Sequence, residues 1–352
     1  MEIYILDKDI NILGVFSTYE SIIWNPKLNE PGLFKASFVF SERMNSILQI
    51  GNLVYKTDEL EPAIITRRFL KLNKFGEETI HVQGYMASRY LNQRIVWKKM
   101  ILKGTPERVM RDMVYEHVVS PEDPDRRMPR IELGNLNGYD GEIEKQVSYD
   151  NLQEALTDIS HVSELGYRLT LDIGAKIFYF DIFKGIDRTL GSQVPCIFTR
   201  DYGNVYTQEY SEDKTNYKNV CLVGGKGEDD ARIMKTVGNG VGLDRYEMFY
   251  SASGLYDKDL TTEQYMLQLE QKGKEKLSSY YAVSAFESKI NYEKAMPFAL
   301  GDYVTCMDSR WNVRVDTQVK EIEKGLSKTE KSFVITFGDD APTLISLIKA
   351  KE

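Results

Sequence analysis

A five-residue pattern occurs twice in this sequence, 250 positions apart. Residues 50–54 read IGNLV and residues 300–304 read LGDYV, so both fit [IL]-G-[ND]-[LY]-V. A strand-like segment precedes each copy, at 34–40 and at 286–293. Similarity within one chain indicates a duplicated structural unit. We therefore expect two similar β-barrels, separated by other structure.

The spacing after each copy also agrees. The interval from Gly51 to Gly84 is 33 residues, and that from Gly301 to Gly338 is 37. In both intervals a long strand and a charged hairpin turn lead to a final strand that ends in glycine. Three chains with two like barrels each can place six barrels in one ring, which is truly threefold and approximately sixfold. Such a ring can bind a sixfold tube on one face and a threefold partner on the other.

The rest of the sequence predicts an α+β, mainly β fold. Residues 1–100 hold six segments rich in β-branched and aromatic residues, which predict the first barrel. The six segments are EIYIL, INILGVF, LFKASFVF, NLVYK, AIITRRFLKL and ETIHVQGY. Residues 101–190 show two helical patterns and a hairpin, and predict an α+β domain. The remaining parts are a discontinuous second barrel at 191–224 and 300–340, a mixed insertion at 225–299 whose last strand joins that barrel, and a C-terminal helix at 341–352.

Three helix starts are expected. Thr105 followed by Pro106 predicts an N-cap and a first helical residue. Asp150 is expected to cap a second helix that ends at Gly166. Thr261, the first residue of TTEQ, is expected to open a third helix.

Charge limits the partners of the chain. With 45 Lys and Arg against 53 Asp and Glu, the net charge is −8. Binding to a phosphate backbone requires a basic face, so tight binding to duplex DNA is not expected. No apolar run approaches the ~18 residues of a membrane span, and the N-terminus is unlike a signal peptide. We expect a protein that stays in the cytoplasm or in an assembly built there, without membrane insertion.

Residues that could hold a metal or act as a base are few and scattered. The cysteines have apolar neighbours and are expected in the core, while the histidines lie within strand and helix patterns, which favours structural roles. No zinc, metalloprotease or hydrolase motif occurs. We therefore assign no catalytic residue, cofactor or metal ligand. The residues considered are Cys196, Cys221, Cys306, His81, His117 and His161.

The glycine-rich stretch at 223–243 suggests a phosphate loop but departs from the known patterns. Lys226 precedes a glycine instead of a hydroxyl residue, and Leu243 stands where a dinucleotide motif needs glycine. Turns between strands are favoured. Its acidic residues Glu228, Asp229 and Asp230 leave one alternative open, a carbohydrate-active, cell-wall degrading enzyme that uses these loop carboxylates. The 22 tyrosines leave another, a polysaccharide-binding module with an aromatic groove.

Four groups of residues along the chain resemble one family. They are NVCLVGGKGE at 219–228 with GLDRYE at 242–247; WNP at 24–26 with PGLF at 31–34; GY at 84–85 with YLNQR at 90–94; and GYR at 166–168 with GIDRT at 185–189. These stretches resemble siphovirus-type tail hub proteins, also called baseplate hub or tail-tip proteins, of phages and prophages.

The resemblance implies a homotrimer whose barrels form a pseudo-hexameric ring with a channel for the tape-measure protein and then DNA, which passes without specific binding. Such a hub joins the distal tail or tail-tube protein to a tail fibre, spike or tip protein. Its place is the virion tail, after assembly in the cytoplasm of the bacterial host. The family offers no catalytic residue, so a structural, non-enzymatic protein is implied.

Overall fold

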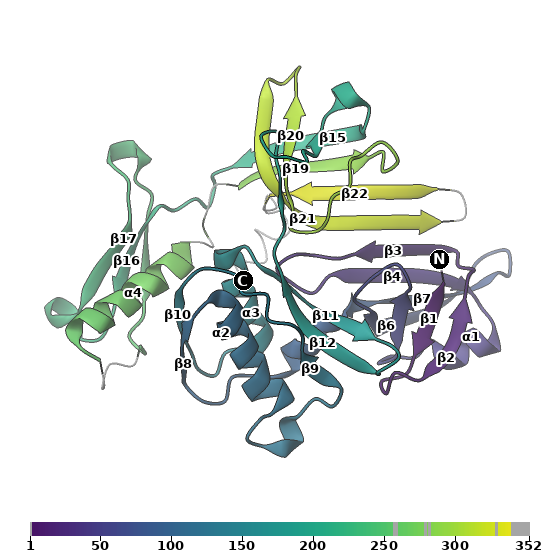
Figure 1. Cartoon of the computed structure of the whole chain (residues 1–352), viewed down its shortest axis with the longest axis horizontal. Helices are drawn as coiled ribbons and strands as arrows, with labels where there is room; N and C mark the ends of the chain where they lie inside the picture. The colour runs from purple at the N-terminus through teal and green to yellow at the C-terminus, as the bar shows by residue number, and fades with distance from the viewer. Residues whose placement is uncertain (1, 256–259, 278–279, 281–282, 328–329, 339–352) are drawn as a thin grey trace.

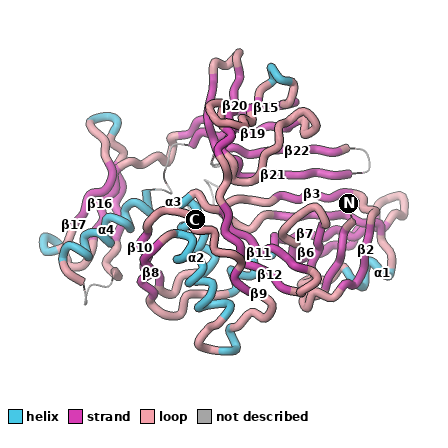
Figure 2. Tube along the Cα trace, viewed as in Figure 1, coloured by secondary structure: helices cyan, strands magenta, loops and turns pink. Residues whose placement is uncertain are grey.

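The computed structural model describes residues 2–255, 260–277, 280, 283–327 and 330–338. The described part of the chain is mostly β-structure arranged in several sheets, as expected (Figure 1, Figure 2). The C-terminal helix expected at 341–352 lies outside the described residues. Among the residues described, no helix is both long and apolar enough to cross a membrane.

The largest sheet of the described chain has 14 strands. They are β1 (Ile3–Leu6), β2 (Ile12–Phe16), β3 (Ser21–Asn25), β4 (Leu33–Val39), β5 (Leu53–Lys56), β6 (Ala63–Leu72), β7 (Glu78–Met86), β13 (Asp187–Arg188), β14 (Ile197–Phe198), β15 (Val205–Asp213), β19 (Val283–Ile290), β20 (Tyr303–Asp308), β21 (Val313–Ser327) and β22 (Lys331–Phe337). The main path runs β15-β19-β22-β21-β3-β4-β7-β6-β5-β1-β2, and β20 pairs with β21, β13 and β14.

The strands of the first hundred residues follow the sequence pattern closely. All six expected strands are present as β1, β2, β4, β5, β6 and β7. In β7 every second residue from Ile80 onward is buried, as strand alternation requires. One strand, β3, was not expected, and neither was the short helix α1 (Glu42–Ile47).

In chain order, an α+β region lies between β7 and β13 of the large sheet. It contains β8 (Met100–Gly104), α2 (Pro106–Val114), β9 (Ile131–Leu133), β10 (Ile143–Val147), α3 (Leu152–Ser163), β11 (Gly166–Asp172) and β12 (Ile177–Phe183). The hairpin β11·β12 is antiparallel, as expected. Leu156 of α3 and Phe180 of β12 share one core with Leu53 and Ile64 of the large sheet. The α+β region is therefore packed directly on the N-terminal strands.

The first helix begins as expected, and the second does not. Thr105 caps α2 by accepting a hydrogen bond from the N–H of Arg108. The cap of α3 is Asn151 and not Asp150, because the Asn151 side-chain oxygen reaches the N–H groups of the first turn. Helix α3 ends at Ser163, before Gly166, which instead starts β11. A side chain at Gly166 would come within 2.3 Å of the Phe183 ring, so close strand packing explains that glycine.

The insertion forms a separate small sheet, seen at the left of Figure 1. Its strands β16 (Val220–Gly224), β17 (Met234–Gly238) and β18 (Glu247–Ser251) pair in the order β17-β16-β18, and α4 (Thr262–Leu277) packs against them. Thr261 caps α4, as expected. The segment 220–224 was expected in the second barrel. It pairs with β17 and β18 instead, because its buried side chains pack under α4. The domain boundaries themselves remain a prediction.

The large sheet contains the same five-strand arrangement twice. Repeat 1 is β3-β4-β7-β6-β5 and repeat 2 is β15-β19-β22-β21-β20, and every neighbouring pair in both is antiparallel. In chain order, the insertion separates the first two strands of repeat 2, where repeat 1 has only a short connection. A duplicated β unit is thus present in the structure.

The register shows which residues correspond. Ile65 of β6 and Val319 of β21 each immediately precede a register shift. Opposite Ile65 lies Gly84, and opposite Val319 lies Phe337. Gly338 is therefore one residue beyond Phe337, the position that matches Gly84. Measured to Phe337, the second interval is 36 residues, which is closer to the first interval of 33 than the count to Gly338 is.

The repeats differ at their outer strand. In repeat 1, β1 runs antiparallel to β5, whereas in repeat 2, β13 and β14 run parallel to β20. Within the described residues, the pairing of β21 with β3 joins the two repeats. In repeat 1, β3 does not pair with β5, and in repeat 2, β15 does not pair with β20. The two units therefore form one continuous sheet.

Candidate functional site: the joint between the repeats

The two repeats meet where β21 pairs with β3, as Figure 1 shows. The strands are antiparallel, from Lys324 opposite Trp24 to Ser327 opposite Ser21. The backbone contact continues beyond β3 along the following residues. The two further hydrogen bonds run from Leu28 N to Lys320 O at 2.9 Å and from Ile322 N to Pro26 O at 3.2 Å. A continuous ladder therefore fixes one repeat relative to the other.

Charged side chains reinforce this joint. Lys27 and Glu321 form an ion pair across it, and Asn25 donates a hydrogen bond to Glu321 at 3.2 Å. Burial opposes the charged form of Lys27, but contacts with Glu321 and Glu30 outweigh burial and raise the pKa of Lys27 to about 12. The ammonium is therefore charged at every physiological pH, and the joint keeps its ion pair.

A second ion pair ties β21 to the other side of repeat 1. Lys324 Nζ lies 2.6 Å from Glu59 Oε1. Glu59 also contacts Lys56, which is buried, at 3.4 Å, and Lys56 pairs with Asp58 at 2.6 Å. Lys56 is shielded from water, so the carboxylates of Asp58 and Glu59 compensate its charge.

Strand β3 supplies half of the joint, and the sequence patterns did not single it out. It has five residues, SIIWN, of which Ile22 and Trp24 point into the core. The available signal was this alternation just before Pro26, which ends the strand. A strand of only five residues gives too short an alternation to be distinguished from the neighbouring loops.

A buried carboxylate positions the β20 side of repeat 2. Asp302 accepts hydrogen bonds from Ile186 N at 2.9 Å, Ala299 N at 2.9 Å and Arg188 Nε at 2.8 Å. Nearby, a side chain at Gly185 would come within 1.8 Å of the Gly301 carbonyl oxygen. The second copy of the sequence pattern, LGDYV, thus holds the GIDRT segment at 185–189 in place. Packing between the two segments accounts for the residues of both.

A pocket of about 250 Å³ lies at the joint, between the two repeats and the α+β region. Trp24 and Lys324 line it, together with Glu61 and Arg168. Glu61 accepts hydrogen bonds from Ser88 N at 2.5 Å and Leu169 N at 3.3 Å. Burial nevertheless raises the pKa of Glu61 to about 7. This carboxyl group therefore titrates close to neutral pH.

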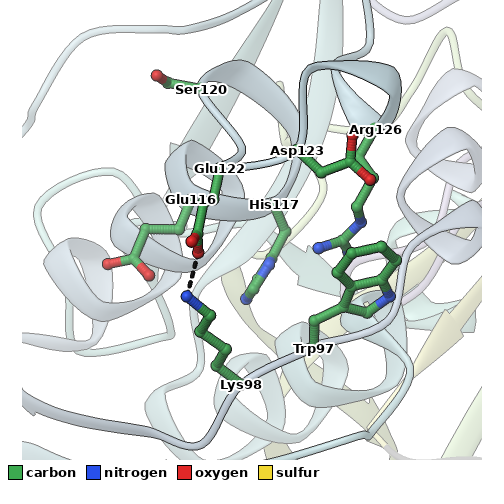
Figure 3. Close-up of a pocket in the computed structure, with 8 residues that line it drawn as sticks. All are labelled: Trp97, Lys98, Glu116, His117, Ser120, Glu122, Asp123 and Arg126. Atoms are coloured by element: carbon green, nitrogen blue, oxygen red, sulfur yellow. Dashed lines mark hydrogen bonds and ion pairs between the residues drawn. The ribbon is translucent and has the colours of Figure 1, made fainter.

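A larger pocket of about 510 Å³ lies in the α+β region, next to the π-helical turn Tyr115–Val119 (Figure 3). Lys98 forms an ion pair with Glu122, and the Arg126 guanidinium lies 4.2 Å from the centre of the Trp97 ring. Four of the groups that line the pocket thus contact one another in two pairs. Its lining residues are Trp97, Lys98, Glu116, His117, Ser120, Glu122, Asp123 and Arg126.

The histidines lie apart, and each belongs to its own element. His117 is buried beside Met100 Sδ at 3.0 Å, and burial lowers its pKa to about 4. His81 on β7 contacts Thr79 Oγ1 at 2.9 Å, and His161 is exposed on α3. Across the described residues, no three His, Cys, Asp or Glu side chains gather as a metal site. The structure therefore does not bring the histidines together.

The three cysteines are unpaired thiols in the core, as expected. Cys196 and Cys306 belong to the core of repeat 2, and Cys221 lies under α4. Burial raises the pKa of Cys196 to about 11 and raises that of Cys306 strongly. Protonated, buried thiols pack as small apolar groups.

The glycine-rich stretch packs against protein and not around an open phosphate site. A side chain at Gly225 would come within 2.7 Å of the Tyr265 hydroxyl, which accepts a hydrogen bond from Lys226 N at 2.8 Å. Arg232 donates to the carbonyl oxygens of Gly224 and Gly225, both at 3.1 Å. These glycines allow a turn to sit under α4.

The acidic residues of this stretch, Glu228, Asp229 and Asp230, are exposed at a short 3-10 turn. None of them lines the pockets described above. A glycosidase needs two carboxyl groups facing each other across a substrate cleft. The structure places these three side chains exposed at a turn, outside both of those pockets.

Comparison with known proteins places the chain in a family. The family model of the siphovirus ReqiPepy6 Gp37-like proteins matches residues 2–339. The chain belongs to this siphovirus family, which confirms the resemblance to siphovirus-type proteins seen in the sequence. No curated protein matches the sequence.

Solved structures show where else this fold occurs. A tail protein from Neisseria meningitidis MC58 has a TM-score of 0.58 at 10% identity, over 96% of both chains. The prophage tail protein gp18 from Listeria monocytogenes EGD-e has a TM-score of 0.57 at 12% identity, over 100% of this chain and 99% of that one. The prophage MuSo2 43 kDa tail protein from Shewanella oneidensis has 0.59 at 11%, over 96% and 98%. The fold of this chain is thus similar to that of phage tail proteins along nearly its full length.

Proposed function

We propose that this chain is a structural tail hub protein of a phage, prophage or phage-tail-like particle. In this role three copies form a ring in which six repeats alternate around a channel. The ring adapts a sixfold tail tube or distal tail ring to a threefold fibre, spike or tip. It works without catalysis, in the virion tail, and is assembled in the bacterial cytoplasm.

The observation that carries this proposal is the duplicated sheet. Repeat 1 and repeat 2 share strand order, strand directions and the register shift, and they are held edge to edge by β21 and β3. Two equivalent units per chain let a trimer present six similar surfaces. The family match and the similar tail-protein folds support the same assignment.

The proposed channel passes the tape-measure protein and then DNA. DNA that must move through a ring is helped by a wall with few cationic contacts to its phosphates. The net charge of −8 is consistent with such a wall. The neighbours in the tail are the tail-tube or distal tail protein above and a fibre or tip protein below.

The proposal is tested by the mass and symmetry of the assembled protein. Light scattering of the purified chain should give three times 40.5 kDa, which is 121.5 kDa. Electron microscopy of the same particles should show a ring with six similar lobes. A stable dimer, or a trimer without a ring, would contradict the tail hub role.

A further inference from the structure

Two strand edges of the large sheet are unpaired in the described structure. Beyond Ile65, β6 pairs with β7 on one side and with no described strand on the other. β15 pairs with β19 and with no other described strand. An open strand edge presents unpaired N–H and C=O groups and is a template for another strand.

These two edges correspond to the ones that already join the repeats. Because Ile65 matches Val319, counting along the strands matches Leu70 of β6 to Lys324 of β21. The same register matches β15 to β3, with Tyr210 in the place of Trp24. Each of these two aromatic side chains packs on a phenylalanine of the next strand. The ring centres are 5.8 Å apart for Trp24–Phe34 and 4.7 Å apart for Tyr210–Phe286.

We propose that β6 of one copy pairs with β15 of a second copy of this chain, antiparallel and in the register of the β21·β3 joint. In this register Leu70 faces Tyr210, Lys71 faces Glu209 and Leu72 faces Gln208 of the neighbour. The inference rests on the proposed function and specifies how its copies are joined. The contact between chains then repeats the contact within each chain.

Charges on the two edges are complementary. Lys71 and Glu209 are both exposed, and neither forms an ion pair within the described residues. Opposite charges that face each other across two strands stabilise the pair. The same count places Arg67 of β6 against Asp213 of the neighbour, where the internal joint has the Lys27–Glu321 pair. The joint between copies would thus carry an ion pair at the same place, with the signs exchanged.

The other face of these edges carries two exposed leucines and a glutamine side chain without a hydrogen-bond partner. Leu70 is 54% exposed and Leu72 is 68% exposed, although both lie on a regular strand. Both side-chain polar atoms of Gln208 are shielded from solvent and make no hydrogen bond in the described structure. Pairing the two edges would cover the two leucines beside Tyr210 and Gln208 of the neighbour.

The two edges lie at opposite ends of one run of strands, β15-β19-β22-β21-β3-β4-β7-β6. A contact between different edges is heterologous, and it closes into a ring when the rotation between copies divides a full turn. Because the proposed contact copies the internal joint, successive repeats would be related by nearly the same rotation throughout.

Cysteine cross-linking tests the register directly. The variant with Lys71→Cys and Glu209→Cys places thiols on residues that face each other, within the ~4.4–6.8 Å Cα separation of a disulfide. Mild oxidation should give covalent dimers and closed trimers on a non-reducing gel. The matched control, Leu70→Cys with Glu209→Cys, puts the thiols on opposite faces of the paired strands and should not cross-link. The native cysteines are buried and provide no background.

Charge exchange provides the second measurement. Lys71→Glu and Glu209→Lys alone should each raise the dissociation constant of the assembly roughly threefold to tenfold, and the double variant should restore it. A ring-shaped trimer without the expected cross-link and without rescue would overturn this strand pairing and leave the tail hub role intact. A chain that stays monomeric at millimolar concentration and gives no cross-link would count against both.

Discussion

Gly51 and Gly301 occupy the same position in the two repeats, with φ angles of 90° and 91°. Each donates its N–H to the carbonyl of the residue before the register shift, Gly51 to Ile65 at 2.8 Å and Gly301 to Val319 at 2.9 Å. The five-residue pattern in the sequence is therefore the signature of one turn, built twice. Its glycine is required because the left-handed region is unfavourable for other residues.

The two glycines differ in what surrounds them, which predicts unequal effects of alanine. At Gly51 a Cβ would meet no atom within 4 Å, while at Gly301 it would lie 3.2 Å from Leu28 Cδ1. Gly51→Ala should lower the free energy of unfolding by about 1 kcal/mol through backbone strain, and Gly301→Ala by more. Urea unfolding measures both. Gly191→Ala is the control, since that site is open and should lose no stability.

Asp302 is expected to be far more sensitive than an exposed carboxylate. Asp302→Ala leaves the Ile186 and Ala299 N–H groups and the Arg188 guanidinium without their acceptor. The loss should be about 3 kcal/mol in the free energy of unfolding. The neighbouring exposed Asp187 is the control, and Asp187→Ala should cost under ~1 kcal/mol. Equal losses in the two variants would show that Asp302 does not anchor this segment.

Glu61 should make the chain more stable at mildly acidic pH. Its pKa is about 7 in the folded protein against an ordinary value of 4.5, so the folded state binds the proton more tightly. The stabilisation is complete below pH 4.5 and is lost as the pH rises through 7. Glu61→Gln, which stays neutral, should be more stable than the natural chain by about 3 kcal/mol at pH 8 and similar to it at pH 4.5.

Thermal unfolding from pH 4.5 to 8 measures this difference. Buried His117 acts in the opposite direction, because its lowered pKa costs stability as the pH falls below 6.5. That contribution is present in both proteins and cancels when they are compared. A constant gap between the two proteins over this pH range would rule out Glu61 as the titrating group.

The exposed acidic turn should be dispensable. Glu228→Gln with Asp229→Asn removes two charges from solvent-exposed side chains and should change the free energy of unfolding by no more than ~0.5 kcal/mol. Assembly and the release of fragments from purified cell wall should equal those of the natural chain. Fragment release that disappears in this variant would favour the carbohydrate-active alternative over the structural role.

Much of the fold could be predicted because local signals were strong. The strands around Ile80 alternate clearly, and Thr105 with Pro106 marks the start of α2. The cap of α3 was wrong by one residue because Asp150 and Asn151 are both good caps, and only the geometry of the first turn selects between them. Which of the two residues caps the helix depends on the backbone conformation just before the first turn.

The joint could not be predicted because it depends on contacts distant in sequence. Trp24 and Lys324 face each other across 300 positions, and nothing near either residue indicates the other. The strand at 220–224 has the composition of a buried strand, but composition does not say which sheet buries it. The duplication was visible because its turn needs a particular residue, whereas strand pairing requires only compatible edges.

The insertion is attached to only one of the two repeats, between β15 and β19. A neighbour that contacts every repeat alike therefore has to bind elsewhere on the sheet. A neighbour that binds the small sheet under α4 meets it once per chain. A partner of the repeats thus finds two similar binding sites on each chain, whereas a partner of the insertion finds one.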